Sequence, residues 1–180
     1  MTHFLDFGVL FGDGLDSLAF SDPHLVGAMG SEFDFDGQAE GIYVLFSAPQ
    51  FQISMKLSDD DGPGTRFMTE VGLMFRNQSF FFDQWEISSA FLDDLDERLW
   101  QVGGRLLGWS SRQVKMELCP NVLVVITQRQ TTKPWLAHAD GTPWYYLDAD
   151  VVLADCHDAY NGALGQTYKC KYVLGEEELM

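Results

Sequence analysis

The peptide bond between Asp22 and Pro23, followed by His24, has the most distinctive chemistry in the sequence. The Asp22 carboxyl can attack its own backbone carbonyl and the basic proline nitrogen leaves readily, which makes such a bond acid-labile. Because histidine titrates near neutral pH, His24 is a candidate to donate a proton to the leaving nitrogen. The alternative is a turn, in which Pro23 fixes its own φ angle and Asp22 caps a neighbour. The residue types favour the turn, and self-cleavage at Asp22 is a hypothesis.

Acidic side chains gather in several short stretches, which raises the question of a cation site. Calcium needs roughly six to eight oxygens that converge from a loop of defined spacing. None of the stretches has the alternating pattern of an EF-hand loop, so solvated loop carboxylates are the favoured interpretation. If calcium does bind, the first candidates are the acids that crowd one segment, namely Asp148, Asp150, Asp155 and Asp158.

A stretch rich in aromatic and turn-forming residues surrounds Asp140-Gly141. Exposed aromatic rings offer a large contact area at low entropic cost, which suits contact with a glycan or a protein. The alternative is a hairpin whose rings fill one end of the core. The candidate binding residues of this stretch are Trp135, Trp144, Tyr145 and Tyr146.

A carbohydrate-active hydrolase with an acidic cleft is the main alternative function. Two facing carboxylates can hydrolyse a glycosidic bond, and tryptophan rings can stack on sugars. However, the sequence lacks the Gly-x-Ser-x-Gly, P-loop and His-Glu-x-x-His motifs. Its histidines are scattered and indicate no pairing of a nucleophile with a base: His3, His24, His138 and His157. The sequence therefore favours a non-enzymatic protein, with no cofactor predicted apart from the calcium alternative.

The charge balance is strongly acidic, because 27 Asp and Glu residues oppose 11 Lys and Arg residues, a formal net charge of −16. Proteins bind phosphate backbones through clustered cations, and this sequence has no such cluster. Nucleic acid and anionic membrane surfaces are therefore excluded as partners, whereas cations, basic proteins and neutral glycans remain open. No apolar run approaches the length of a membrane span, and the N-terminal stretch lacks the basic segment of a signal peptide.

The three cysteines fit neither a disulfide framework nor a zinc signature. Cys156 and Cys170 bracket a glycine-rich turn region and could pair with each other. Cys119 would then remain in or beside an apolar strand. Three buried or free thiols are the equally supported alternative.

Short apolar segments separated by turn residues dominate the sequence and predict β-strands. The clearest strand runs from Phe51 to Leu57, where apolar and polar residues alternate with a period of two. The run from Val122 to Ile126 is rich in β-branched residues, which is typical of a central strand. A helical turn is expected over Asp93 to Trp100, ending before Gly103-Gly104. Further strands are expected over residues 41–47, 66–75, 79–87, 114–118, 144–147 and 151–153.

Roughly ten strands with regular turn signals predict an all-β fold, an antiparallel sandwich or flattened barrel with one short helix. Residues 22–174 are expected to form this domain, with residues 1–21 as an N-terminal extension or an edge strand and residues 175–180 as an acidic tail. A domain of this size buries enough surface to fold without a metal or a disulfide.

Several short motifs resemble those of a known family. They are Asp22-Pro23-His24, Gly27-Ala28-Met29-Gly30, Phe33-Asp34-Phe35-Asp36-Gly37, Ile42-Tyr43-Val44-Leu45, Val71-Gly72-Leu73-Met74-Phe75 and Gly162-Ala163-Leu164-Gly165-Gln166-Thr167-Tyr168. Over residues 22–75 and 158–172 the chain resembles von Willebrand factor type D domains and the related plant root-cap proteins. The resemblance implies a β-rich module of a secreted or cell-surface protein, often part of an adhesive or matrix assembly.

The chain also departs from the family pattern. Calcium-binding type D domains carry an acid where Met29 stands, and acidic or amide residues after the glycine that corresponds to Gly165, which Gln166 and Thr167 follow here. A thioether and an amide are weak ligands for a hard cation. Self-cleaving members have a Gly-Asp-Pro-His tetrad, whose first position is Ser21 here. The resemblance therefore implies a non-enzymatic interaction or structural module that contacts glycans or proteins.

Overall fold

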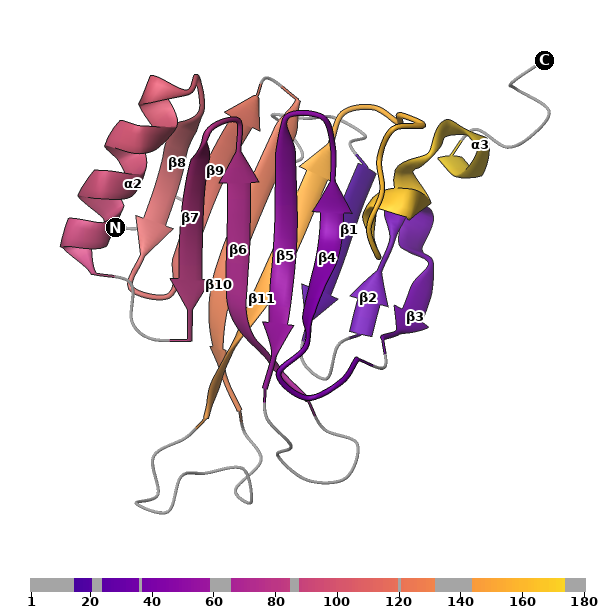
Figure 1. Cartoon of the computed structure of the whole chain (residues 1–180), viewed down its shortest axis with the longest axis horizontal. Coiled ribbons are helices and arrows are strands. Elements are labelled where there is room, and N and C mark those ends of the chain that lie inside the picture. Colours follow the sequence, from indigo (N-terminus) through magenta and orange to yellow (C-terminus); the bar gives the residue numbers. More distant parts are fainter. Residues whose placement is uncertain are drawn as a thin grey trace.

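The computed structural model describes residues 15–20, 24–35, 37–58, 66–84, 88–119, 121–131 and 144–173. Within these ranges, two antiparallel sheets lie face to face as a sandwich (Figure 1), which confirms the predicted all-β class. The larger sheet has the order β3-β2-β1-β11-β10-β9-β8 and the smaller sheet the order β4-β5-β6-β7. The strands are β1 (Leu15–Phe20), β2 (His24–Val26), β3 (Glu32–Asp34), β4 (Ile42–Ser47), β5 (Phe51–Leu57), β6 (Met68–Phe75), β7 (Gln78–Asp83), β8 (Arg105–Ser110), β9 (Gln113–Cys119), β10 (Val122–Gln130) and β11 (Tyr145–Leu153).

The smaller sheet shows how alternation sorts side chains between the core and water. In β5, Phe51, Ile53 and Met55 are buried against the larger sheet, while the residues between them lie on the outer face. This confirms the predicted period of two. In β4 the register shifts between Val44 and Phe46. This irregularity leaves Leu45 and Phe46 both buried, although they are consecutive residues.

The larger sheet is centred on β10, which pairs with β9 on one side and β11 on the other. Residues 122–128 are all buried, as expected for a strand covered on both faces. Strand β11 runs without a break from Tyr145 to Leu153, whereas the sequence predicts two shorter strands. The acids at 148 and 150 suggest a turn, but the side chain of Asp148 forms an ion pair with Arg129 and stays in the strand.

The N-terminal strand β1 pairs with β2 and with β11. Residues 15–20 therefore form an interior strand, and the prediction of an extension or an edge strand is wrong for this segment. The partner strand lies more than a hundred residues further along the chain, so no local sequence pattern could indicate the pairing. Strand β3 occupies the edge, where the Asp34 side chain points to solvent, as predicted.

Helix α2 (Ser89–Gln101) is longer than the predicted turn and lies beside β7 and β8 at one edge of the sandwich (Figure 1). The Ser88 side chain accepts a hydrogen bond from the Phe91 amide and caps the helix. Gly103, at a φ of 77°, ends it. The buried face consists of Leu92, Leu95 and Leu99, and each such side chain contributes about 1.5–3 kcal/mol. Within the described part of the chain, no helix has the length and apolar character to cross a membrane.

The C-terminal segment covers the other edge of the sandwich with the 3-10 helix η3 (Gly165–Tyr168) and the short helix α3 (Cys170–Val173) (Figure 1). It meets the 3-10 helix η1 (Ala28–Gly30), which connects β2 and β3. The Leu164 amide donates to the Leu45 carbonyl at 2.8 Å. The buried Tyr168 ring packs edge-on against Phe46, and its hydroxyl donates to the Val151 carbonyl at 3.0 Å. Tyr168 therefore ties this segment to both sheets.

Candidate functional site

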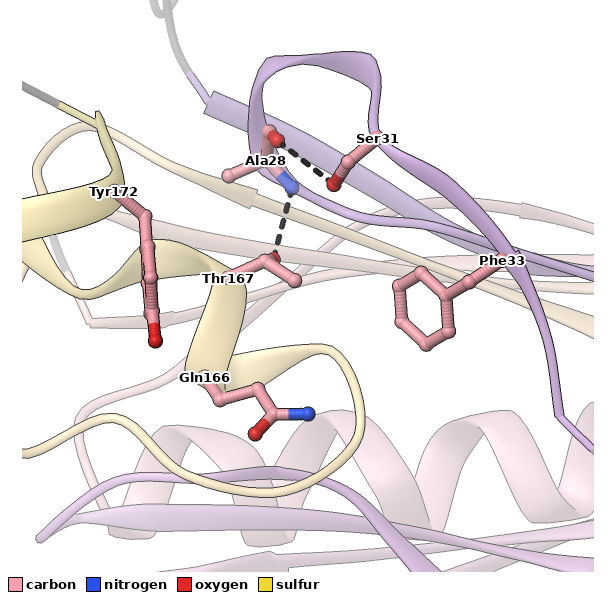
Figure 2. A pocket seen from close by; sticks show the side chains of 6 residues that line it. All are labelled: Ala28, Ser31, Phe33, Gln166, Thr167 and Tyr172. Atoms are coloured by element: carbon pink, nitrogen blue, oxygen red, sulfur yellow. Dashed lines mark hydrogen bonds between the residues drawn. The ribbon is translucent and has the colours of Figure 1, made fainter. Parts of the chain in front are cut away.

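Two segments that lie far apart in the sequence meet around a surface cavity, called the junction pocket here. The first segment comprises η1 and β3, and the second comprises η3 and α3. The Ala28 amide donates to Thr167 Oγ1 at 2.9 Å, and the Thr167 hydroxyl in turn donates to the Leu164 carbonyl at 2.6 Å. Figure 2 shows the first of these bonds between the two segments. The contact joins the two patches that carry the family resemblance.

The walls of the junction pocket combine aromatic rings with neutral polar groups. The cavity has a volume of about 500 Å³, within the usual range for small-molecule sites. Phe33 and Tyr172 supply the rings, and the polar groups come from Ser31, Gln166 and Thr167. In Figure 2 Thr167 lies between the two rings, and the Gln166 side chain extends from η3 below them. None of the described residues that line the cavity carries a charged side chain.

Two glycines allow the segments to approach this closely. A Cβ atom on Gly27 would lie 2.6 Å from Thr167 Cγ2, which is closer than real Cβ contacts permit. Gly162 has a φ of 94°, and its Cβ would lie 2.7 Å from the Leu45 carbonyl oxygen. A larger residue at either position would push the walls apart or strain the backbone.

A disulfide between Cys156 and Cys170 holds the outer wall of the junction pocket. Cys170 begins α3, which carries Tyr172, and its amide donates to Asp158 Oδ1 at 3.2 Å. The pairing confirms one of the two sequence alternatives. Cys119 is a half-buried free thiol, and burial raises its pKa above the ordinary 9.0.

A second cavity, called the Trp144 cleft here, has a volume of about 520 Å³. Its described walls include Glu40, Lys56 and Glu70 from the outer face of the smaller sheet, together with Trp144. Lys56 Nζ lies 3.0 Å from Glu40 Oε2 and 3.0 Å from Glu70 Oε1. Hydrogen bonds with Glu40 and then with Glu70 raise the pKa of Lys56 above 10.5.

The aromatic residues that the sequence singles out do not form one surface. The half-buried Trp144 lines the cleft. The Tyr146 ring stacks on Phe67, with centroids 5.1 Å apart, and the guanidinium of Arg112 lies 5.5 Å from the Tyr145 ring. Trp135 lies outside the described residues. Trp144 is thus a predicted binding residue that lines a described cavity.

The acids proposed for calcium serve separate local contacts. Asp148 is buried and lies 2.7 Å from Arg129 Nε, and its hydrogen bond is the main cause of the raised pKa of Arg129, to which Asp150 also contributes. Asp158 accepts the Cys170 amide, as described above. Asp155 lies near Tyr160, whose pKa is raised mainly by burial and then by this negative charge. Over the described residues, no group of three or more His, Cys, Asp or Glu side chains is arranged to hold a metal.

The self-cleavage hypothesis falls mostly outside the described residues, because Asp22 and Pro23 lie there. The adjoining His24 begins β2, where its Nδ1 pairs with Asp34 Oδ1 across to β3. This contact gives His24 a local structural role. Cleavage at Asp22 stays a prediction.

Sequence reasoning missed most residues of both cavities. One signal was available, namely three consecutive phenylalanines in one strand. Because successive side chains of a strand point to opposite faces, the middle ring faces away from the core when the other two face it. Phe81 is this middle residue, and it lines the Trp144 cleft at 72% exposure. For Ser31, Gln166 and Tyr172 there was no such signal, because their proximity depends on the tertiary fold.

Comparison of the sequence with known protein families and with curated proteins finds no match. The resemblance to type D domains therefore stays a prediction that rests on the motifs in residues 22–75 and 158–172.

Proposed function

We propose that this chain is a non-enzymatic binding module of a secreted or cell-surface protein, and that it holds a neutral glycan in the junction pocket. The observation that carries the proposal is the composition of the pocket walls. They combine two aromatic rings with hydroxyl and amide groups, and no charged side chain is among the described lining residues.

A pyranose ring has apolar C–H faces and a rim of hydroxyls, and the pocket offers a partner for each. Phe33 and Tyr172 present ring surface to the C–H faces. The Gln166 amide both donates and accepts, as does the hydroxyl of Ser31. A charged ligand would meet no counter-charge among the described lining residues, and its desolvation would be costly. A neutral, hydroxyl-rich ligand is therefore the best chemical match.

A binding role is supported over hydrolysis by the arrangement of the carboxylates. The described lining of the junction pocket has none, so it lacks the pair of carboxyls with which most glycosidases act. In the Trp144 cleft, Lys56 lies between Glu40 and Glu70 and pairs with both. Both carboxylates are engaged by the same lysine, whereas a hydrolase directs its two carboxyls at the substrate.

The location outside the cytosol is supported by the Cys156–Cys170 disulfide, because disulfides persist mainly in oxidising compartments. The motifs that resemble type D domains point in the same direction. Calcium is not part of the proposal, because the described walls of the junction pocket lack the carboxylates that a hard cation prefers.

The test is a calorimetric titration of the full chain with neutral oligosaccharides of glucose, galactose, mannose and xylose. We expect at least one to bind, and Tyr172→Ala and Gln166→Ala to weaken that binding by about tenfold or more. Trp100→Ala is the matched control, because Trp100 is an exposed aromatic on α2 at the opposite edge of the sandwich (Figure 1).

Two results contradict the proposal. One is the absence of binding to any neutral oligosaccharide, or binding that Tyr172→Ala leaves unchanged. The other is the release of shorter sugars during prolonged incubation with the chain, which would indicate a hydrolase.

A further inference from the structure

The outer face of the smaller sheet concentrates negative charge at the Trp144 cleft. Glu70 pairs directly with Asp83 across β6 and β7, and both side chains point to solvent. Like charges in directly opposite positions destabilise a sheet. With Glu40 the described lining has three carboxylates and one ammonium group, that of Lys56. The described lining of the cleft therefore has more carboxylates than ammonium groups.

Aromatic surface lies next to these carboxylates. Phe81 is 72% exposed, although it follows and precedes buried phenylalanines in β7. Its ring lies beside Gly72 on the neighbouring strand, where an added Cβ would be 3.7 Å from the ring edge. Trp144, from the start of the larger sheet's β11, lines the same cleft. Rings beside carboxylates form a site that attracts a cation through both charge and the ring quadrupole.

The cleft also contains an acceptor that lacks a donor. Gln84 lines the cleft, and its side-chain oxygen Oε1 is buried and accepts no hydrogen bond among the described residues. A buried acceptor left in this state costs about 1–3 kcal/mol. Because almost none of this oxygen is exposed, a ligand could donate to it only after the Gln84 side chain moves.

We propose that the Trp144 cleft binds an arginine side chain of a basic peptide segment in a partner protein. A guanidinium has five donors and no acceptor, which matches a site made of carboxylates and an amide oxygen. Its plane can stack on an aromatic ring while its edge bonds a carboxylate with two parallel hydrogen bonds. The ammonium of lysine cannot make both contacts in this way. The net charge of −16 attracts basic segments and speeds their association.

The test is a titration of the full chain with three synthetic peptides that differ only in one repeated residue: arginine, lysine or citrulline. Citrulline has almost the shape of arginine but no charge. We expect the arginine peptide to bind at least about tenfold more tightly than either analogue. Equal affinity for the arginine and citrulline peptides, or for the arginine and lysine peptides, would overturn the proposal.

Variants on the same sheet face sharpen the test. Glu70→Gln and Phe81→Ala should each weaken binding of the arginine peptide by about tenfold. Asp96→Asn removes the same charge from exposed α2 and should change the affinity by less than about twofold, because distant exposed charges are screened.

Lys56→Gln should change the affinity for the arginine peptide in the opposite direction. It removes the internal cation that competes for Glu40 and Glu70, so the arginine peptide should bind several-fold more tightly. Damage to the fold would weaken binding, so the sign separates the two explanations. Unchanged or weaker binding to this variant would overturn the proposal, as would displacement of the arginine peptide by a neutral oligosaccharide.

Discussion

The junction pocket and the Trp144 cleft differ in chemistry although their volumes are close, about 500 Å³ and 520 Å³. The described walls of the first are neutral, whereas the second has three carboxylates around one lysine. The overall charge of −16 is therefore spread unevenly over the lining of the two sites. Net charge alone would predict the same cationic partner for both.

The two cavities also differ in how the chain builds them. Strand pairing forms the Trp144 cleft largely from neighbouring positions on β5, β6 and β7. In contrast, the junction pocket depends on a hydrogen bond between residues 139 positions apart, on two glycines and on a disulfide. Ligand binding in the junction pocket should therefore be lost when one of these distant contacts is removed. Binding in the Trp144 cleft should depend mainly on the charges of its lining residues.

The largest expected effect comes from Phe46→Ala. Phe46 is fully buried and contacts Phe51, Tyr160 and Tyr168. Its truncation should lower the free energy of unfolding by about 3–5 kcal/mol. Chemical denaturation measures this loss. Ile42→Ala is the control on the same strand, since Ile42 is 73% exposed. A similar loss of stability there would contradict the interpretation that Phe46 acts through its buried contacts.

The next effect comes from removal of the disulfide by Cys156→Ser together with Cys170→Ser. A cross-link over 14 positions should contribute about 3 kcal/mol to stability. Because α3 would then be released, we expect glycan binding in the junction pocket to be lost. The arginine peptide should still bind in the Trp144 cleft of the folded variant. Equal weakening of both ligands would show that the two sites are not independent.

Gly162→Ala tests the close approach behind the junction pocket. The residue has a φ of 94° and no room for a Cβ beside the Leu45 carbonyl. We expect a loss of about 1–3 kcal/mol in stability and weaker glycan binding, measured by denaturation and titration. Gly108→Ala is the matched control, because a Cβ there meets no atom within 4 Å.

The smallest effect is a difference in alkaline pH dependence. The pKa of Lys56 is raised by Glu40 and Glu70, so its ion pairs stabilise the fold fully below 10.5. This stabilisation fades as the pH rises through the higher folded-state value. Loss of the lysine charge should also tighten binding of an arginine peptide. Titrations at rising pH should show this trend in the parent chain and not in Lys56→Gln, and a trend of equal size in that variant would contradict it.

Much of the fold could be predicted because it follows from local pattern. The alternation in β5 identifies a strand that is buried on one face, and the β-branched run in β10 identifies a strand that is buried on both faces. Neither inference requires knowledge of the neighbouring strands. The interior position of β1 could not be predicted, since it depends on pairing with distant β11. The single strand β11 was expected as two, over residues 144–147 and 151–153, because the sequence does not reveal that Arg129 lies beside Asp148.

The candidate sites also combine residues that the local sequence could indicate with residues that only the folded chain brings together. Trp144 was predicted as a binding residue, and the outward position of Phe81 can be read from three consecutive phenylalanines. The motif around Gly165 drew attention to Gln166 and Thr167 only as a departure from the calcium ligands of type D domains. Their position opposite Phe33, in a pocket without a described carboxylate, depends on the folded chain alone.

The register shift in β4 has a consequence for how this domain can vary. Because one additional residue there reverses the side toward which the later side chains point, Phe46 reaches the interior. Loss of the Leu45 codon would make the pairing regular and leave Phe46 opposite Ile53, with its ring still in the core beside Tyr168. The shortest in-frame deletion should therefore be better tolerated at this point than in the alternating strand β5, where it would turn the later side chains to the opposite face, and a deletion scan of the gene should show that difference.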